Sequence, residues 1–212
     1  MKNVINKTVV VIVVLTAINS PIAIAETTAN VGVVSQYHYR GIQQTSGTSA
    51  SAGLDYEEGS FSLGTWAADV EDGIEIDVYG SYSFDLNDDL SFSIGATSYQ
   101  YTGDFDSAYN EVNLGASISD FEISYSIGKW DGVVSNEAAT KNSYTVLNIG
   151  YTLGSFTGTV GIYGDDVEGE YFDLIYKTKI AEFDVGVGIL ISGSDLDDDE
   201  SIYFSFSKKI DL

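Results

Sequence analysis

Apolar and polar residues alternate strictly along most of this chain. Residues 121–128 read Phe-Glu-Ile-Ser-Tyr-Ser-Ile-Gly, with an apolar residue at every odd position. Successive side chains of a β-strand point to opposite faces, so such a segment has one apolar and one polar face. The pattern predicts strands. It leaves open whether their apolar faces point inward to a core or outward to lipid.

Twelve alternating segments can be drawn, most of them near the 9–11 residues that a tilted strand needs to cross a bilayer. They are residues 30–39, 49–56, 60–68, 74–85, 90–101, 108–118, 121–130, 143–152, 155–163, 170–179, 182–191 and 201–210. Short turns alternate with longer connections at 41–48, 69–73, 102–107, 131–142, 164–169 and 192–200. This arrangement predicts an all-β fold, a transmembrane antiparallel up-and-down β-barrel of about 12 strands.

A soluble binding barrel has the same alternation with the faces reversed. The number of strands favours the membrane barrel, because twelve strands with an apolar face inward would enclose a large apolar void. Aromatic residues near the strand ends suit the interfacial girdles of membrane barrels, although aromatics also have high strand propensity. These residues are Tyr37, Tyr39, Phe61, Phe84, Phe121, Tyr151, Phe156 and Phe183.

The last strand supports the same interpretation. Ile202, Phe204, Phe206, Ile210 and the terminal Leu212 share one face. Outer-membrane barrels commonly end in such a strand, so we expect it to engage the outer-membrane assembly machinery.

The N-terminal 25 residues predict an export signal. Lys2 and Lys7 precede an apolar stretch from Val9 to Ala17, and Ala23-Ile24-Ala25 is a small-x-small cleavage site. We expect residues 1–25 to be a cleaved signal peptide and residues 26–212 to be one barrel domain in the outer membrane of a Gram-negative bacterium. No apolar run after residue 25 is long enough for a membrane helix.

The chain is strongly acidic. Its formal charge is −23, and removal of Lys2 and Lys7 with the signal peptide leaves seven basic against 32 acidic residues. This charge excludes nucleic acid as a partner, while 13% aromatic residues exclude disorder. We expect divalent cations to bridge the acidic connections between strands to outer-membrane lipid and lipopolysaccharide.

The polar register carries mixed but net acidic charge. Rings of carboxylates favour cations in a narrow aqueous pore, so these residues are candidates for the lumen and its constriction. Alternatively they pair across the interior and close it, with Arg40, the only arginine, bridging carboxylates bidentately. The candidates are Arg40, Trp66, Glu75, Asp77, Glu111, Glu122, Asp173, Lys177 and Asp184.

No catalytic arrangement is indicated. The only histidine, His38, could serve many serines as a base, but no spacing selects one of them, so we expect no enzyme activity. The acidic segment at 195–200 could bind a divalent cation through oxygen ligands, but it lacks the spacing of a recognised calcium loop. We therefore expect no cofactor and no metal site.

A Ser-x-Tyr-x-x-Arg-Gly-Ile core lies at residues 35–42, with further motif residues at 30–34, 44–45, 64–67 and 75–79. Through these residues the N-terminal third resembles the TorF-like porin family of proteobacterial proteins, also called the Gcw family. Thr102 stands where the family pattern has a proline. The resemblance implies an outer-membrane barrel of suspected channel function without an established substrate. Arg40, Trp66 and Asp77 match the family pattern and share the polar register.

These observations predict a passive outer-membrane channel for small solutes that favours cations or neutral polar molecules. The main alternative is a closed structural or adhesive barrel with acidic surface loops. A soluble periplasmic binding barrel comes third.

Overall fold

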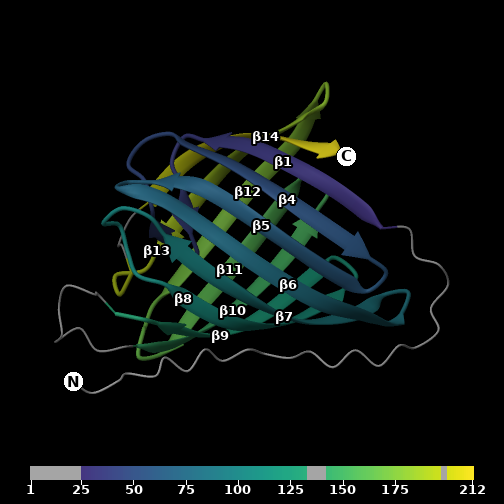
Figure 1. Cartoon of the computed structure of the whole chain (residues 1–212), viewed down its shortest axis with the longest axis horizontal. Coiled ribbons are helices and arrows are strands. Elements are labelled where there is room, and N and C mark those ends of the chain that lie inside the picture. The colour runs from purple at the N-terminus through teal and green to yellow at the C-terminus, as the bar shows by residue number, and fades with distance from the viewer. Residues whose placement is uncertain (1–24, 133–141, 197–199) are drawn as a thin grey trace, which may run out of the picture.

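The chain forms a closed antiparallel β-barrel. The structure is a computed structural model, and it describes residues 25–132, 142–196 and 200–212. Twelve strands of these residues close the barrel in the order β1, β14, β13 and so on back to β4 (Figure 1). They are β1 (Glu26–Val34), β4 (Ser49–Glu58), β5 (Phe61–Val70), β6 (Gly73–Asn87), β7 (Leu90–Tyr101), β8 (Tyr109–Ile118), β9 (Phe121–Trp130), β10 (Ser143–Leu153), β11 (Phe156–Asp165), β12 (Glu170–Ile180), β13 (Phe183–Ser192) and β14 (Glu200–Asp211).

The first and last strands close the barrel. Along this seam β1 pairs antiparallel with β14, from Thr28 opposite Asp211 to Val34 opposite Ser205. On its other side β1 pairs with β4. The predicted fold class and strand number are confirmed. Among the described residues, none lies in a helix that is long and apolar enough to cross a membrane.

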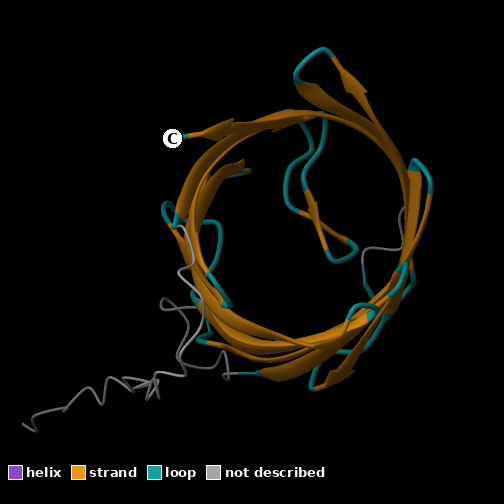
Figure 2. Cartoon of the chain, turned by 90° about the vertical axis from the view of Figure 1, so that its right-hand side faces the viewer, coloured by secondary structure: helices purple, strands orange, loops and turns teal. Residues whose placement is uncertain are grey.

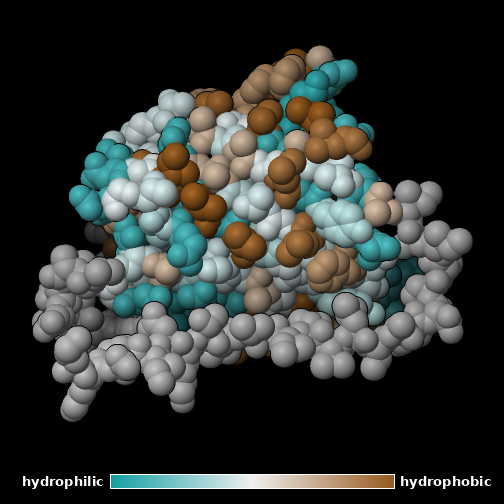
Figure 3. All heavy atoms as spheres, in the orientation of Figure 1, coloured by the Kyte–Doolittle hydropathy of each residue, from teal (hydrophilic) through white to brown (hydrophobic). Residues whose placement is uncertain are grey.

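Apolar side chains cover the outside of the barrel. On β6, Ile76 and Val78 are exposed, whereas the neighbouring Glu75 is 1% exposed and faces the lumen. The same alternation holds on β8, where Val112 is exposed and Glu111 is 3% exposed. Figure 3 shows apolar side chains spread over one outer face. The soluble alternative, with its apolar face inward, is therefore wrong.

The two ends of the barrel differ. At one, which we call the turn end, two-residue turns join β4 to β5, β6 to β7, β8 to β9, β10 to β11 and β12 to β13. The other, the loop end, carries the longer connections. One connection there is shorter than expected. Instead of a loop at 69–73, β5 and β6 extend to Val70 and Gly73 and leave a two-residue turn, Glu71-Asp72.

Exposed aromatic pairs lie at the turn end. Ring centroids are 4.6 Å apart for Phe121 and Tyr151, and 5.0 Å apart for Phe156 and Tyr176. These rings lie on the outer face next to the turns, where an interfacial girdle is expected.

The predicted first strand, 30–39, is wrong at both ends. The strand in the barrel wall is β1, which starts at Glu26 and stops at Val34. Residues 35–48 then leave the wall and fold into the barrel, where they form the short hairpin β2 (His38–Tyr39) and β3 (Ile42–Gln43) seen inside the barrel in Figure 2. Tyr37 and Tyr39 are therefore lumen residues rather than girdle residues, and His38 and Arg40 are not on a wall strand.

Three predictions fall wholly or partly on residues outside the described ranges. One is the connection at 131–142, of which 133–141 are not described. The predicted signal peptide is residues 1–25, of which the structure describes only Ala25. The acidic segment 195–200 includes residues 197–199, which are also not described.

Candidate functional site: the barrel lumen

The hairpin inside the lumen, residues 35–48, is built on a tight turn. Arg40 and Gly41 both have positive φ, 50° and 87°, as a two-residue type I′ turn requires. His38 pairs with Gln43, and Tyr39 pairs with Ile42. At its base, the Tyr37 nitrogen donates to Thr45 Oγ1 at 2.9 Å, and the Gln44 nitrogen donates to the Tyr37 carbonyl at 2.7 Å. We call residues 35–48 the inner hairpin.

A buried ion pair fixes the tip of the inner hairpin to one wall. The Arg40 guanidinium donates to both carboxylate oxygens of Glu111 on β8, at 2.6 and 3.1 Å, and to Ser126 Oγ at 3.0 Å. The Glu111 side chain is fully buried and also accepts bonds from the hydroxyls of Tyr99 and Tyr144, at 3.0 and 2.8 Å. A buried charge is tolerated when it is paired and hydrogen-bonded in this way.

The opposite wall also holds the hairpin tip. Ser192 on β13 donates its hydroxyl to the Gly41 carbonyl, and Tyr163 on β11 donates to the Arg40 carbonyl at 3.1 Å. An added Cβ on Gly41 would lie 2.7 Å from Cβ of Tyr171 on β12. Glycine therefore allows the tip to approach this wall closely. The inner hairpin spans the lumen as a strut between β8 and the β11–β13 wall.

A third contact fixes the start of the inner hairpin. The Tyr37 hydroxyl donates to Glu75 Oε1 on β6 at 3.1 Å, and its ring packs edge-on against Trp66 at 5.6 Å between centroids. Burial, with the nearby Glu75 carboxylate, raises the pKa of Tyr37 well above its ordinary value. Tyr37 therefore remains protonated and keeps its role as a donor.

Tyrosine hydroxyls also donate hydrogen bonds to lumen carboxylates at other positions. Tyr79 donates to Asp55 at 2.5 Å, and Tyr203 donates to both oxygens of Asp173 at 2.9 Å. A hydroxyl donor stabilises a carboxylate without cancelling its charge. These lumen carboxyl groups therefore have hydrogen-bond partners inside the barrel.

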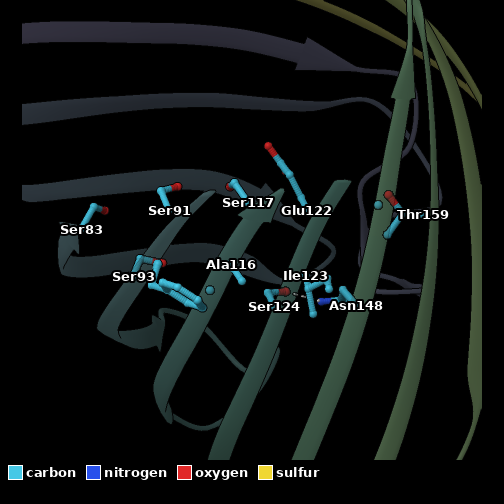
Figure 4. A pocket seen from close by; sticks show the side chains of 13 residues that line it. Ser83, Ser91, Ser93, Ala116, Ser117, Glu122, Ile123, Ser124, Asn148 and Thr159 are labelled. Carbon is cyan, nitrogen blue, oxygen red and sulfur yellow. Dashed lines mark hydrogen bonds between the residues drawn. The ribbon is translucent and has the colours of Figure 1, made fainter. Parts of the chain in front are cut away.

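Cavities lie on both sides of the inner hairpin. Toward the turn end, one of about 330 Å³ is lined by small hydroxyl side chains together with Glu122 and Asn148 (Figure 4). Beside the hairpin, another of about 260 Å³ is lined by Arg40, Thr159, Asp173 and Tyr203. A third, of about 240 Å³, lies on the loop-end side. The hairpin thus marks the narrow level of the lumen.

The structure brings some of the candidate residues together at this level. Arg40 binds Glu111, and Trp66 lies opposite Asp77 across β5 and β6 and packs on Tyr37, which binds Glu75. The remaining candidates lie elsewhere in the barrel. Asp173 lines the cavity beside the hairpin and Glu122 the turn-end cavity, while Lys177 is exposed and Asp184 pairs with Lys179 at 3.0 Å.

Sequence reasoning missed the inner hairpin and its tyrosine partners. One signal was present, because Arg40-Gly41 lies between short extended segments and a glycine at the second turn position favours a type I′ hairpin. The tyrosines of β7, β10 and β11 gave no comparable signal, since their partners come from distant parts of the chain. Among the described residues, no group of three or more His, Cys, Asp or Glu side chains could hold a metal ion.

A family model described as "Bacterial protein of unknown function (Gcw_chp)" matches residues 18–205. The chain belongs to this family. The match extends the Gcw resemblance from the N-terminal third to nearly the whole barrel. No curated protein matches the sequence.

Solved membrane barrels share the fold of this Gcw chain at low identity. The KdgM porin has 10% identity and a TM-score of 0.57, with 87% of this chain and 99% of that chain covered. The NanC porin has 8% identity and a TM-score of 0.54, with 84% and 97% covered. A chain from a study of in-meso crystallisation of membrane proteins has 9% identity and a TM-score of 0.62, with 88% and 84% covered. At these identities the likeness concerns the fold alone.

Proposed function

We propose that this protein is an outer-membrane channel of the TorF-like porin type, through which small solutes diffuse passively and anions are disfavoured. The observation that carries the proposal is the acidic lumen. Its carboxylates are held by tyrosine hydroxyls, and its arginine is neutralised by Glu111. In a narrow aqueous path, uncancelled carboxylates favour cations and neutral polar molecules. The porin folds reported above support a non-enzymatic channel role.

The membrane placement is part of this proposal. The exposed apolar face supports lipid around the barrel, with the turn end in the periplasm and the loop end outside the cell. Export by a cleaved signal peptide at 1–25, insertion by the assembly machinery through β14, and contact of the acidic loops with lipopolysaccharide belong to the same proposal.

Recording from the purified barrel in a planar bilayer tests the channel. We expect discrete conductance steps. Under a KCl gradient, we expect a reversal potential whose sign indicates selectivity for K⁺ over Cl⁻. Absence of steps, or a reversal potential on the anion side, contradicts the proposal.

A second candidate is a closed structural or adhesive barrel. The observation that favours it is the inner hairpin, which is bonded to opposite walls. Conductance of the unaltered protein separates the two candidates. A closed barrel conducts only after the hairpin is released, for example in Arg40→Ala.

A further inference from the structure

The cavity on the loop-end side of the inner hairpin is lined mainly by aromatic rings. It lies between the hairpin and the connection 102–108 and has a volume of about 240 Å³. This is below the size of pockets for drug-sized ligands and suits a smaller molecule. Phe105 and six tyrosines line it, and we call it the tyrosine cup. The tyrosines are Tyr39, Tyr99, Tyr101, Tyr109, Tyr144 and Tyr163.

The hydroxyl protons of most of these tyrosines point away from a ligand. Tyr39 donates to the Tyr99 hydroxyl at 2.6 Å, and both Tyr99 and Tyr144 donate to Glu111. Tyr109 donates to Asp106 at 2.6 Å, and Tyr163 donates to the Arg40 carbonyl. A hydroxyl has one proton and two lone pairs, so each of these groups is left as an acceptor. The cup therefore offers aromatic rings and acceptor oxygens.

The positive charge at the floor of the cup, that of Arg40, is already paired with a carboxylate. The Arg40 guanidinium forms its bonds to Glu111 and Ser126 and lies 4.8 Å from the centroid of the Tyr39 ring. The bidentate pair with Glu111 cancels the charge of Arg40 locally. A carboxylate or phosphate ligand would therefore meet few free donors and no uncompensated cation on the walls just described.

A negative charge in the wall of the cup remains uncompensated. Asp106 accepts bonds from Trp130 Nε1 at 2.8 Å, from its neighbour Ser107 and from Tyr109. These are neutral donors, and within the described ranges no lysine or arginine forms an ion pair with Asp106. The charge of Asp106 stands beside the rings of Phe105 and Tyr109.

We propose that the tyrosine cup binds a small organic ammonium ion. The faces of aromatic rings are electronegative and attract a cation placed over them, best when water is excluded. Alkyl groups on the nitrogen fill the apolar space between the rings, and Asp106 supplies the counter-charge. As the first station for a permeating solute, the cup rests on the proposed channel function. Binding itself needs no conduction.

Binding of choline to the full barrel in detergent tests the cup, with 3,3-dimethyl-1-butanol as the comparison. The two molecules have nearly the same shape, but carbon replaces the charged nitrogen in the second. Saturation-transfer NMR on the ligand methyl signals gives both affinities. We expect choline to bind at least about tenfold more tightly, the factor that a desolvated cation–π contact supplies. Equal affinities, or no binding of choline, overturn the proposal.

Variants then locate the site. Phe105→Leu and Tyr101→Leu each remove one ring, and Asp106→Asn removes the counter-charge. We expect each to weaken choline binding several-fold. The matched control is Phe84→Leu on the exposed outer face, which makes the same change outside the cup and should leave binding unchanged.

The heat-dependent gel migration of folded barrels shows which variants are folded, and two ring variants keep the test open if one is not. Folded variants that bind choline as tightly as the unaltered protein overturn the assignment. Because the assay measures no current, a barrel that binds choline without conducting contradicts the proposed channel and leaves the cup intact.

Discussion

At the scale of single residues, the structure of the lumen depends on hydrogen bonds that tyrosine hydroxyls donate to acidic side chains. Glu111 shows this most fully, since Tyr99, Tyr144 and Arg40 all donate to it. Removing one partner from a buried ion pair costs about 3–5 kcal/mol, because the other charge stays buried without compensation. The position of the inner hairpin is therefore expected to be sensitive to Arg40.

Replacing Arg40 with alanine should release the inner hairpin from β8. The barrel should still fold, because its wall is held by strand pairing, but the lumen should widen. Single-channel recording should show larger and noisier current steps. Lys179→Ala, which removes an exposed ion pair with Asp184, is the control and should conduct as the unaltered protein does. An Arg40→Ala channel with unchanged current steps would show that the hairpin does not limit the lumen.

Replacing Gly41 with alanine should push the hairpin tip away from Tyr171. The φ of 87° costs an alanine roughly 1–2 kcal/mol, and its Cβ would lie 2.7 Å from that of Tyr171. Arg40 is the only arginine in the chain, so an arginine-specific protease cuts only after it. We expect slow cleavage of the unaltered barrel and faster cleavage of Gly41→Ala.

The control for that variant is Gly154→Ala. Gly154 has a φ of 61°, but an added Cβ would meet no atom within 4 Å. Backbone strain alone, at the turn end, should not speed cleavage after Arg40. If both variants are cut at the same rate as the unaltered barrel, contact with Tyr171 does not position the tip.

The contact between Ser46 and Glu71 should depend on pH. The Ser46 nitrogen and hydroxyl donate to the two oxygens of Glu71 at 2.8 and 2.9 Å. These bonds, the backbone one first, lower the pKa of Glu71. A lowered pKa in the folded state means that the contact is stabilising above the pKa of the unfolded chain and is lost as the pH falls through the folded value. Ser46→Ala should raise the pKa of Glu71 part of the way to its ordinary value, as an NMR titration of the Glu71 carboxyl would show.

At the scale of secondary-structure elements, the strands after residue 48 were predictable and the inner hairpin was not. Alternation fixes which residues share a face, so β7, β9 and β10 lie within a residue or two of their predicted ranges. Alternation also continues through Tyr37 and Tyr39, because the hairpin is itself extended. Where an extended chain leaves the wall is decided by distant partners such as Glu75 and Glu111.

The two faces of β11 provide a direct test of the strand register. Val160 is exposed on the outer face, and its neighbour Thr159 lines the lumen cavities. An arginine on the lipid face near mid-membrane costs about 2–4 kcal/mol. Val160→Arg should therefore reduce the free energy of unfolding from vesicles by that amount, measured by denaturant titration.

Thr159→Arg is the matched control on the adjacent residue. It places the same charge in the lumen, so it should fold nearly as well as the unaltered protein while it shifts the reversal potential toward anions. Equal destabilisation by both arginines would contradict the assignment of the faces.

At the scale of the whole molecule, the closed barrel was predictable from its sequence, but the arrangement of its interior only in part. Polar parity placed Glu75 and Glu111 in the lumen, and the bidentate role of Arg40 was one of two open alternatives. Alternation along a strand predicts which face of the barrel wall a side chain lies on, but it does not predict the position of that side chain along the barrel axis. It therefore grouped Lys177 and Asp184 with residues at the narrow level, although they lie nearer the turn end.

The inner hairpin also constrains how the barrel assembles. The contacts of Arg40 with Glu111 and Tyr163 join residues that are 71 and 123 positions apart in the chain. The contact of Gly41 with Ser192 joins residues 151 positions apart. Such distant contacts form late, because much of the intervening chain must first be ordered. The hairpin follows the first strand, yet its full set of partners exists only once the wall around it has been built. We therefore expect the hairpin to remain unfixed until β8, β11 and β13 are in place around it, so the lumen is wider during folding than in the finished barrel.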